Sequence, residues 1–132
     1  MKNIVSAVAI IVFVSILTLP LTPLCFADAT NVDGILKRAR TDGKAVMLEL
    51  GSVGCIPCEQ MKPVMKKLSE NYKGKLEVVF IDVRRDGNAA RRYGVYVIPT
   101  QVFLDRNGKE FHRHVGFYDY EEIVPVLKKA GL

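Results

Sequence analysis

The stretch AVMLELGSVGCIPCEQMKPVMKKL, residues 45–68, decides the fold of this chain. Its first six residues form a short, almost continuous apolar run, which is typical of a strand covered on both faces. After the two cysteines, apolar residues return at helical spacing. These residues are Met61, Val64, Met65 and Leu68. The stretch therefore predicts a strand that leads directly into a helix, with Cys55 and Cys58 where the helix begins.

Outside this stretch, the chain continues to alternate between helical and strand patterns. Helices are predicted over 31–41, 86–93 and 119–129, and strands over 76–83, 100–105 and 109–115. The apolar run over 76–83 predicts a second buried strand, parallel to the first. Asn107-Gly108 between two apolar runs is a strong hairpin signal, so the last two strands should be antiparallel and join the sheet on one side. The order αβαβαββα predicts an α/β fold, a central mixed β-sheet of about four strands flanked by helices on both faces.

Residues 1–27 have the three parts of a secretory signal peptide. A basic start precedes an apolar segment over 4–19, and small residues follow at Ala27 and Ala29. Cleavage after Ala27 would leave residues 28–132 as one domain. The alternative is a retained membrane anchor, because the apolar segment approaches the roughly 20 residues that span a bilayer. In both cases we expect the domain to work outside the cytoplasm, in the periplasm or cell envelope.

Composition and charge narrow the classes of function. A chain of 132 residues and 14.7 kDa holds one domain and is too small for a multidomain enzyme. Its formal net charge is +5, but the basic residues are scattered and the longest basic runs are pairs. Nucleic-acid binding usually needs a basic stripe with interleaved aromatics, so we expect no nucleic-acid partner. Three cysteines are too few for a disulfide-stapled mini-protein, so their placement matters more than their number.

Cys55 and Cys58 are three residues apart at the predicted start of a helix. Unpaired backbone N–H groups and the positive end of the helix dipole favour a thiolate at Cys55, which lowers the pKa of its thiol and makes it the attacking nucleophile. Cys58, one turn further along the helix, is close enough to resolve a mixed disulfide on Cys55. Pro57 fits the first helical turn, where its missing N–H costs little, and it stiffens the loop between the sulfurs.

The cysteine pair has two alternative uses, a static disulfide or one half of a zinc site. A structural disulfide that closes only two intervening residues gains little loop entropy, so stapling explains this spacing poorly. Zinc needs two more ligands. His112 and His114 alternate on one predicted strand and so share a face, but nothing in the sequence places them beside the cysteines. We therefore expect no metal and no cofactor.

The motifs around the cysteines resemble those of the thioredoxin family, in particular its exported bacterial members. The resemblance covers about residues 31–132 and rests on Cys55-Ile56-Pro57-Cys58, Pro63, Tyr93-Gly94, Ile98-Pro99-Thr100 and Gly116. It implies a disulfide oxidoreductase with a cis Ile98–Pro99 peptide bond that faces the cysteines. A client peptide is then expected to pair in extended form with the backbone around Ile98, beside Cys55. Ile56 and Pro57 would belong to the same substrate-binding surface, whereas the alternative for Pro99 is an ordinary proline at the start of a strand.

Glu49 lies in the apolar run before the cysteines, where a carboxylate is costly to bury without a purpose. It falls six residues before Cys55, where thioredoxins carry a buried aspartate that handles the proton of the second cysteine. By resemblance, Glu49 would be the general base for Cys58, and burial should raise its pKa toward the working pH. The alternative is that Glu49 points outward at the end of its strand.

The chain departs from thioredoxins close to the cysteines. Gly54 and Ile56 stand where thioredoxins have Trp and Gly. Phe80 replaces a lysine that many thioredoxins carry, and Glu59 replaces a basic residue. Because these positions surround the sulfurs, they leave the redox potential and the direction of electron flow open.

The function expected from the sequence is the reduction of protein disulfides through a cycle of Cys55 and Cys58 between dithiol and disulfide. The expected partners are protein thiol or disulfide clients and a membrane thiol carrier that donates electrons, and the chain is expected to be a monomer. Two alternatives remain. One is an oxidase or isomerase that uses the same cysteines, and the other is a non-catalytic module that binds thiols or a metal.

Overall fold

The computed structural model describes residues 32–132. The predicted signal peptide over 1–27 and the third cysteine, Cys25, lie outside the described residues. No helix within residues 32–132 is both long enough and apolar enough to cross a lipid bilayer. In chain order the elements are α2 (Val32–Thr41), β1 (Ala45–Gly51), α3 (Ile56–Asn71), β2 (Leu76–Asp82), α4 (Gly87–Arg92), β3 (Thr100–Leu104), β4 (Glu110–Val115) and α5 (Tyr120–Lys129).

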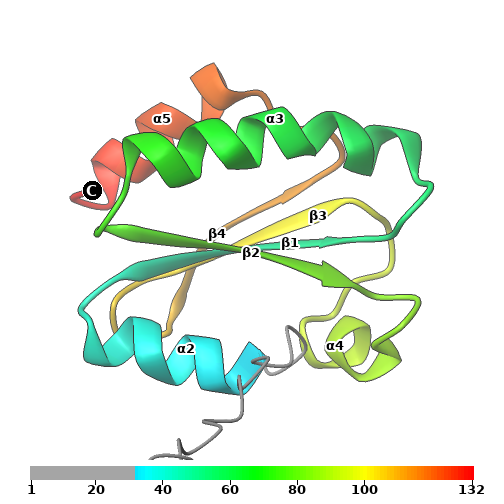
Figure 1. Ribbon diagram of the computed structural model, residues 1–132, viewed down its shortest axis with the longest axis horizontal. Helices are drawn as coiled ribbons and strands as arrows, with labels where there is room; N and C mark the ends of the chain where they lie inside the picture. The colour runs from blue at the N-terminus through cyan, green and yellow to red at the C-terminus, as the bar shows by residue number, and fades with distance from the viewer. Residues whose placement is uncertain (1–31) are drawn as a thin grey trace, which may run out of the picture.

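The four strands form one mixed sheet in the order β2-β1-β3-β4. β1 pairs in parallel with β2, whereas β3 is antiparallel to both β1 and β4. Helices α3 and α5 cover one face of the sheet, and α2 and α4 cover the other (Figure 1). The predicted α/β fold, with its parallel strand pair and its hairpin on one side, is therefore confirmed.

β1 lies at the centre of the core. It is buried along its whole length because it has a strand on each side and helices on both faces. Successive side chains of a strand point to opposite faces. Val46 and Leu48 accordingly pack on the side of α2 and α4, while Ala45 and Met47 pack on the side of α3 and α5. Glu49 continues the alternation of Ala45 and Met47, so its side chain is directed toward α3.

β2 is not the fully buried strand that its apolar run predicts. The side chains that it buries are those of Leu76, Val79 and Ile81, and Phe80 is 38% exposed. The reason is topological, because β2 pairs with β1 on one side and has no described strand on the other. An apolar run predicts a strand, but it does not distinguish a central strand from an edge strand.

Candidate active site

Three segments that are far apart in the sequence meet at one end of the sheet. Leu50, near the end of β1, pairs with Thr100 at the start of β3, and Thr100 pairs with Val115 at the end of β4. The loop after β1, the loop before β3 and the segment after β4 therefore share one end of the sheet, on the right in Figure 1. Together they carry the two cysteines, the predicted cis-proline and Gly116.

Cys55 and Cys58 form a disulfide at the start of α3. Cys55 immediately precedes the helix, Pro57 lies in its first turn, and Cys55 is half-buried whereas Cys58 is only 2% exposed. The loop reaches this position through Gly54, whose φ of +79° lies in the left-handed region that favours glycine. The pair therefore sits at the helix N-terminus as predicted, with its first sulfur nearer to solvent and its second one inside.

Gly51 allows the end of β1 to approach the second cysteine closely. A Cβ atom at this position would lie 3.1 Å from Cys58 Sγ and 3.2 Å from the ring of Phe80. Both separations are shorter than the 3.5–4.0 Å or so that non-bonded heavy atoms prefer. Phe80 stands on β2 opposite Glu49, so its ring covers the edge of the sheet beside Cys58. The position at which many thioredoxins carry a lysine is thus occupied by an apolar side chain, that of Phe80.

Glu49 is fully buried, at 0% exposure. The alternative in which it points outward is therefore wrong. Neither carboxyl oxygen has a hydrogen-bond partner among the described residues. Burial raises the pKa of Glu49 from its ordinary 4.5 to about 7, and the neighbouring Gln101 side chain acts in the opposite, lowering direction. Both protonation states of this carboxyl are consequently accessible near neutral pH.

The loop before β3 carries the Ile98–Pro99 peptide bond, which is cis. Ile98 is half-buried and Pro99 is buried. Two hydrogen bonds hold the loop: the Thr100 hydroxyl donates to the carbonyl of Val97 at 2.6 Å, and the Gly116 N–H donates to the carbonyl of Pro99 at 2.8 Å. The first bond lies within the loop, and the second joins the loop to the segment after β4, so the cis-proline is held from its own loop and from one neighbouring segment.

The sequence does not predict a role for two buried polar side chains of this site. Ser52 and Gln101 are both 0% exposed. The Ser52 hydroxyl and the Gln101 carbonyl oxygen have no hydrogen-bond partner among the described residues. The signal for Gln101 was available, because it is a polar residue inside a predicted apolar strand, which is the same pattern that singles out Glu49. Ser52 follows the strand directly and looks like an ordinary loop residue in the sequence.

The described residues provide no metal centre beside the cysteines. No group of three or more His, Cys, Asp or Glu side chains within 32–132 is arranged to hold a metal ion. The two histidines of β4 instead pack around Tyr118. A ring nitrogen of His112 lies 3.1 Å from the Tyr118 hydroxyl, and the His114 ring stacks on the tyrosine with 3.9 Å between centroids. Burial lowers the pKa of His112, and the nearby charge of His114 lowers it further.

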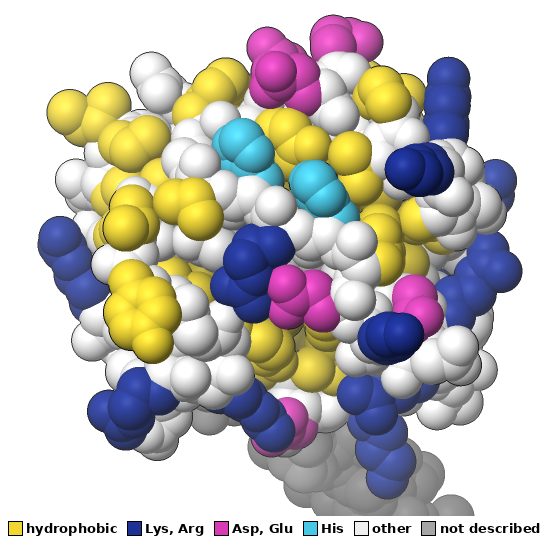
Figure 2. All heavy atoms as spheres, turned by 180° about the vertical axis from the view of Figure 1, so that it is seen from behind, with side chains coloured by type: hydrophobic (Ala, Val, Ile, Leu, Met, Phe, Trp, Pro, Cys, Tyr) yellow, Lys and Arg dark blue, Asp and Glu magenta, His cyan; other side chains and the backbone are white. Residues whose placement is uncertain are grey.

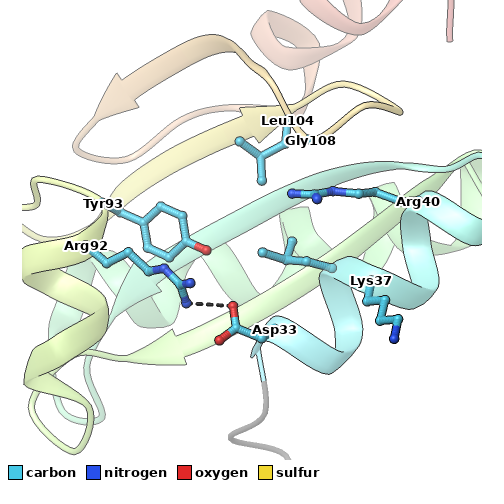
Figure 3. Close-up of a pocket in the computed structure, with 8 residues that line it drawn as sticks. Asp33, Lys37, Arg40, Arg92, Tyr93, Leu104 and Gly108 are labelled. Atoms are coloured by element: carbon cyan, nitrogen blue, oxygen red, sulfur yellow. Dashed lines mark hydrogen bonds and ion pairs between the residues drawn. The ribbon is translucent and has the colours of Figure 1, made fainter.

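A cavity of about 450 Å³ lies away from the cysteines, between α2, α4 and the β3–β4 hairpin (Figure 3). Arg92 of α4 and Asp33 of α2 form an ion pair across it, with 2.6 Å between Nη1 and Oδ1. The Tyr93 ring and Leu104 also line the cavity, and Lys37 and Arg40 of α2 lie along its side (Figure 3). No residue of the cysteine site lines this cavity.

Comparison with known proteins agrees with this geometry. Residues 32–131 match the family described as "Thioredoxin-like domain". The chain belongs to the thioredoxin-like family. The match extends from the start of α2 to beyond the end of α5, so it includes every element that positions the cysteines in this thioredoxin-like protein. The family predicted from the motifs is therefore confirmed, whereas membership of its exported bacterial branch remains a prediction.

Relatives of this thioredoxin-like protein include thioredoxins from plants and bacteria. It is 28% identical over 101 residues to "Thioredoxin Y, chloroplastic" of Oryza sativa subsp. japonica, which covers 76% of this chain and 58% of the rice protein. It is 28% identical over 91 residues to thioredoxin of Staphylococcus aureus, which covers 69% of this chain and 86% of that protein. The chain thus spans less than two thirds of the rice protein but most of the bacterial one.

Solved structures of thioredoxins have the same fold. A wild-type thioredoxin h from poplar superposes with a TM-score of 0.65 at 29% identity, over 74% of this chain and 86% of that chain. The germline-specific thioredoxin Deadhead from Drosophila melanogaster superposes with a TM-score of 0.63 at 28% identity, over 74% of this chain and 91% of that chain. These similarities confirm the thioredoxin-like fold and support thiol–disulfide chemistry in general.

Proposed function

We propose that this thioredoxin-like protein reduces disulfides of protein clients outside the cytoplasm, through a dithiol–disulfide cycle of Cys55 and Cys58. The observation that carries the proposal is the disulfide between these residues. Cys55 lies at the N-terminus of α3, and Cys58 is buried. Glu49 is a fully buried carboxyl, and strand alternation directs it to the face of the sheet that α3 covers. A nucleophile, a resolving thiol and a base are the three groups that such a cycle needs.

Cys55 carries out the first step. In the reduced protein its thiolate attacks one sulfur of a client disulfide, and the client S–S bond breaks. A new S–S bond joins Cys55 to that client sulfur, while the other client sulfur leaves as a thiolate. The start of α3 favours the attacking thiolate, because its unpaired N–H groups and helix dipole stabilise negative charge. Cys55 is also the more exposed of the two cysteines, so a client reaches it first.

Cys58 and Glu49 carry out the second step. The thiol of Cys58 gives its proton to the Glu49 carboxylate, directly or through a water molecule. The resulting thiolate attacks the sulfur of Cys55, which forms the Cys55–Cys58 disulfide and releases the second client thiolate. The client gains two electrons, the protein loses two, and the released thiolates take protons from solvent and from Glu49. A pKa of about 7 allows Glu49 to accept and return a proton at neutral pH.

The distribution of exposed apolar side chains supports a protein client rather than a small thiol. All seven large hydrophobic residues that are exposed within 32–132 lie on the segments around the cysteines or on the edge strand beside them. They are Val53, Ile56, Phe80, Tyr96, Val97, Val115 and Phe117. Figure 2 shows the molecule from behind, and hydrophobic side chains gather on its left, toward the end of the sheet that carries the cysteines. Exposed apolar surface of this kind marks an interaction site.

The proposed location rests on the sequence. Residues 1–27 have the parts of a secretory signal, so the domain would work in the periplasm or cell envelope. A reductase there needs a supply of electrons. We assign this role to a membrane thiol carrier, which would reduce the Cys55–Cys58 disulfide by the same two-step exchange in reverse. An oxidase or isomerase would use the same residues if the reduced form were the more stable one.

Reduction of insulin by the pre-reduced full-length protein tests the proposal. Wild type and Cys25→Ser should reduce insulin equally, because Cys25 is not part of the cycle. Cys55→Ser should be inactive, and Cys58→Ser should accumulate a covalent adduct with insulin through Cys55. If wild type and Cys55→Ser were equally inactive while metal co-purified in stoichiometric amount, the protein would be a binding module instead.

A redox titration of the cysteine couple against glutathione tests the direction. A reductase should have a potential well below that of the glutathione pool, so the pair should remain oxidised until the buffer is strongly reducing. A potential above that of protein disulfide isomerase, roughly −180 mV, would mean that the same cysteines oxidise clients. Export is tested separately, by locating the full-length protein and determining the N-terminus of its mature form.

A further inference from the structure

Gln101 is a buried amide that faces the proposed base. β3 places Gln101 directly opposite Glu49 of β1, and both side chains are 0% exposed. Met47 and Phe103, two residues away on the same strands, both pack on the side of α3 and α5. Strand alternation therefore directs Glu49 and Gln101 to that same face. Directly opposed residues in an antiparallel pair have Cβ atoms about 4.5–5.5 Å apart, so these two side chains are within reach of each other.

The amide of Gln101 also contacts the segment that holds the cis-proline. Its Nε2 donates a hydrogen bond to the carbonyl of Gly116 at 3.1 Å. The N–H of Gly116 in turn donates to the carbonyl of Pro99 at 2.8 Å. A continuous series of contacts thus leads from the proposed base, through the Gln101 side chain and one glycine, to the loop that would bind the client.

The Gln101 amide has a donor and an acceptor to spare, and these are the two groups that a carboxyl needs as partners when it gains and loses a proton. An amide nitrogen carries two hydrogens and an amide oxygen accepts. One N–H of Gln101 is used on Gly116, while the carbonyl oxygen has no partner among the described residues. The remaining N–H is suited to an ionised carboxylate, and the carbonyl oxygen to the O–H of a protonated carboxyl. Both oxygens of Glu49 are likewise without a partner within 32–132.

We propose that Gln101 is a positioning residue for Glu49, whose amide partners the carboxyl in both protonation states and ties it to the segment that holds Pro99. The proposal rests on the proposed function of Glu49 as the proton acceptor for Cys58. Gln101 neither touches the client nor exchanges a proton with Cys58. It keeps the carboxyl in one orientation while the proton comes and goes, and it links that orientation to the client-binding loop.

The test removes the amide while keeping the length of the side chain, in Gln101→Met. The Glu49 carboxyl is titrated by carbon-13 NMR of the full-length oxidised protein, in which neither Cys55 nor Cys58 carries a thiol. Loss of the amide should move the Glu49 midpoint upward by about one pH unit, which corresponds to the loss of one hydrogen bond to the ionised form. The wild-type Gln101 side-chain amide signals should titrate with the same midpoint as Glu49.

A kinetic experiment measures the step for which Glu49 is the proposed proton acceptor, the attack of Cys58 on a mixed disulfide at Cys55. The probe is a mixed disulfide between Cys55 and 5-thio-2-nitrobenzoate, from which attack by Cys58 releases a coloured thiolate. In Gln101→Met the release rate at pH 7 should fall several-fold, and raising the pH should restore it. In the Glu49→Gln background, the same change should have no further effect on the pH profile, because the group through which Gln101 acts is absent.

Thr100→Val is the matched control. It removes a partly buried hydrogen bond of the same loop, from the Thr100 hydroxyl to Val97. Thr100 pairs with Leu50 and not with Glu49, so the Glu49 midpoint should stay at its wild-type value. The proposal is overturned if Glu49 titrates identically in wild type and Gln101→Met. If Gln101→Met does not fold, the wild-type protein still provides a test. The proposal is overturned if the Gln101 side-chain amide signals do not change over the pH range in which Glu49 titrates. The NMR measurements use no client, so a failure to reduce insulin would refute the proposed function separately.

Discussion

The burial of Glu49 makes a quantitative prediction about stability and pH. Its pKa is about 7 in the folded protein against an ordinary value of 4.5, which applies to the unfolded chain. The folded protein therefore holds a proton between these pH values that the unfolded chain has lost. Because stability falls with pH wherever the folded state binds more protons, the free energy of unfolding should decrease as the pH rises from about 4.5 through 7.

The size of the effect follows from the two pKa values. A pKa difference of one between the folded and unfolded states corresponds to roughly 1.4 kcal/mol. Titration of Glu49 should therefore lower the free energy of unfolding of the wild-type protein by about 3 kcal/mol between pH 4.5 and pH 8. The full contribution is present below pH 4.5, where both states are protonated, and it is lost above the folded pKa. Glu49 is completely buried, so solvent does not screen this cost.

Glu49→Gln removes the titration and should flatten the curve. Urea unfolding of the oxidised protein at pH 5 and pH 8 measures the difference, and the disulfide remains intact in both states. From pH 5 to pH 8, wild type should lose about 2.5 kcal/mol more of its free energy of unfolding than Glu49→Gln loses. Glu122→Gln, which removes an exposed carboxylate of α5, should keep the wild-type dependence. Equal pH dependence in wild type and Glu49→Gln would refute the reasoning.

Three further predictions concern packing, capping and surface charge. Gly51→Ala places a methyl group 3.1 Å from the sulfur of Cys58 and should lower the free energy of urea unfolding by about 1–3 kcal/mol, in the range of other overpacked cores. Asp119 caps α5 by accepting a hydrogen bond from the N–H of Glu121, so Asp119→Ala should cost about 1 kcal/mol in the same assay, and Asp119→Asn should restore most of it. Asp33→Asn breaks the Asp33–Arg92 ion pair, whose side chains are 66% and 56% exposed, and should change the thermal midpoint of unfolding by only the equivalent of about 0–1 kcal/mol. A loss of several kcal/mol there would show that the pair is not a solvated surface contact.

The sequence predicts most of the fold because local signals agree along the chain. The apolar run of β1, the hairpin signal at Asn107-Gly108 and the helical repeat after the cysteines each fix one element, and their order then limits the topology to few arrangements. β2 shows what such local signals do not predict. Its apolar residues report a strand, but its place at the edge depends on which strands pair, and that information is spread over the whole chain.

The candidate site was predictable only in part for a similar reason. Cys55 and Cys58 are marked by their spacing, and Glu49 is marked as a charge inside an apolar run. Gln101 is likewise a polar residue inside an apolar strand, but its role depends on the β1–β3 register that sets it opposite Glu49. The position of Phe80 beside Cys58 depends likewise on a register, that of β2 against β1. The redox potential depends on the difference in free energy between the oxidised and reduced forms, to which all these contacts contribute.

The pairing of Leu50 with Thr100 brings the cysteine loop and the proline loop together through backbone hydrogen bonds of the sheet. The spacing between the two halves of the site is thus independent of which side chains the loops display. Under the proposed function, substitutions in either loop would alter which clients bind there and how strongly, while the backbone hydrogen bonds between β1 and β3 keep the sulfur and the proline loop aligned. The set of clients could then change without a change in the chemistry of the cysteines.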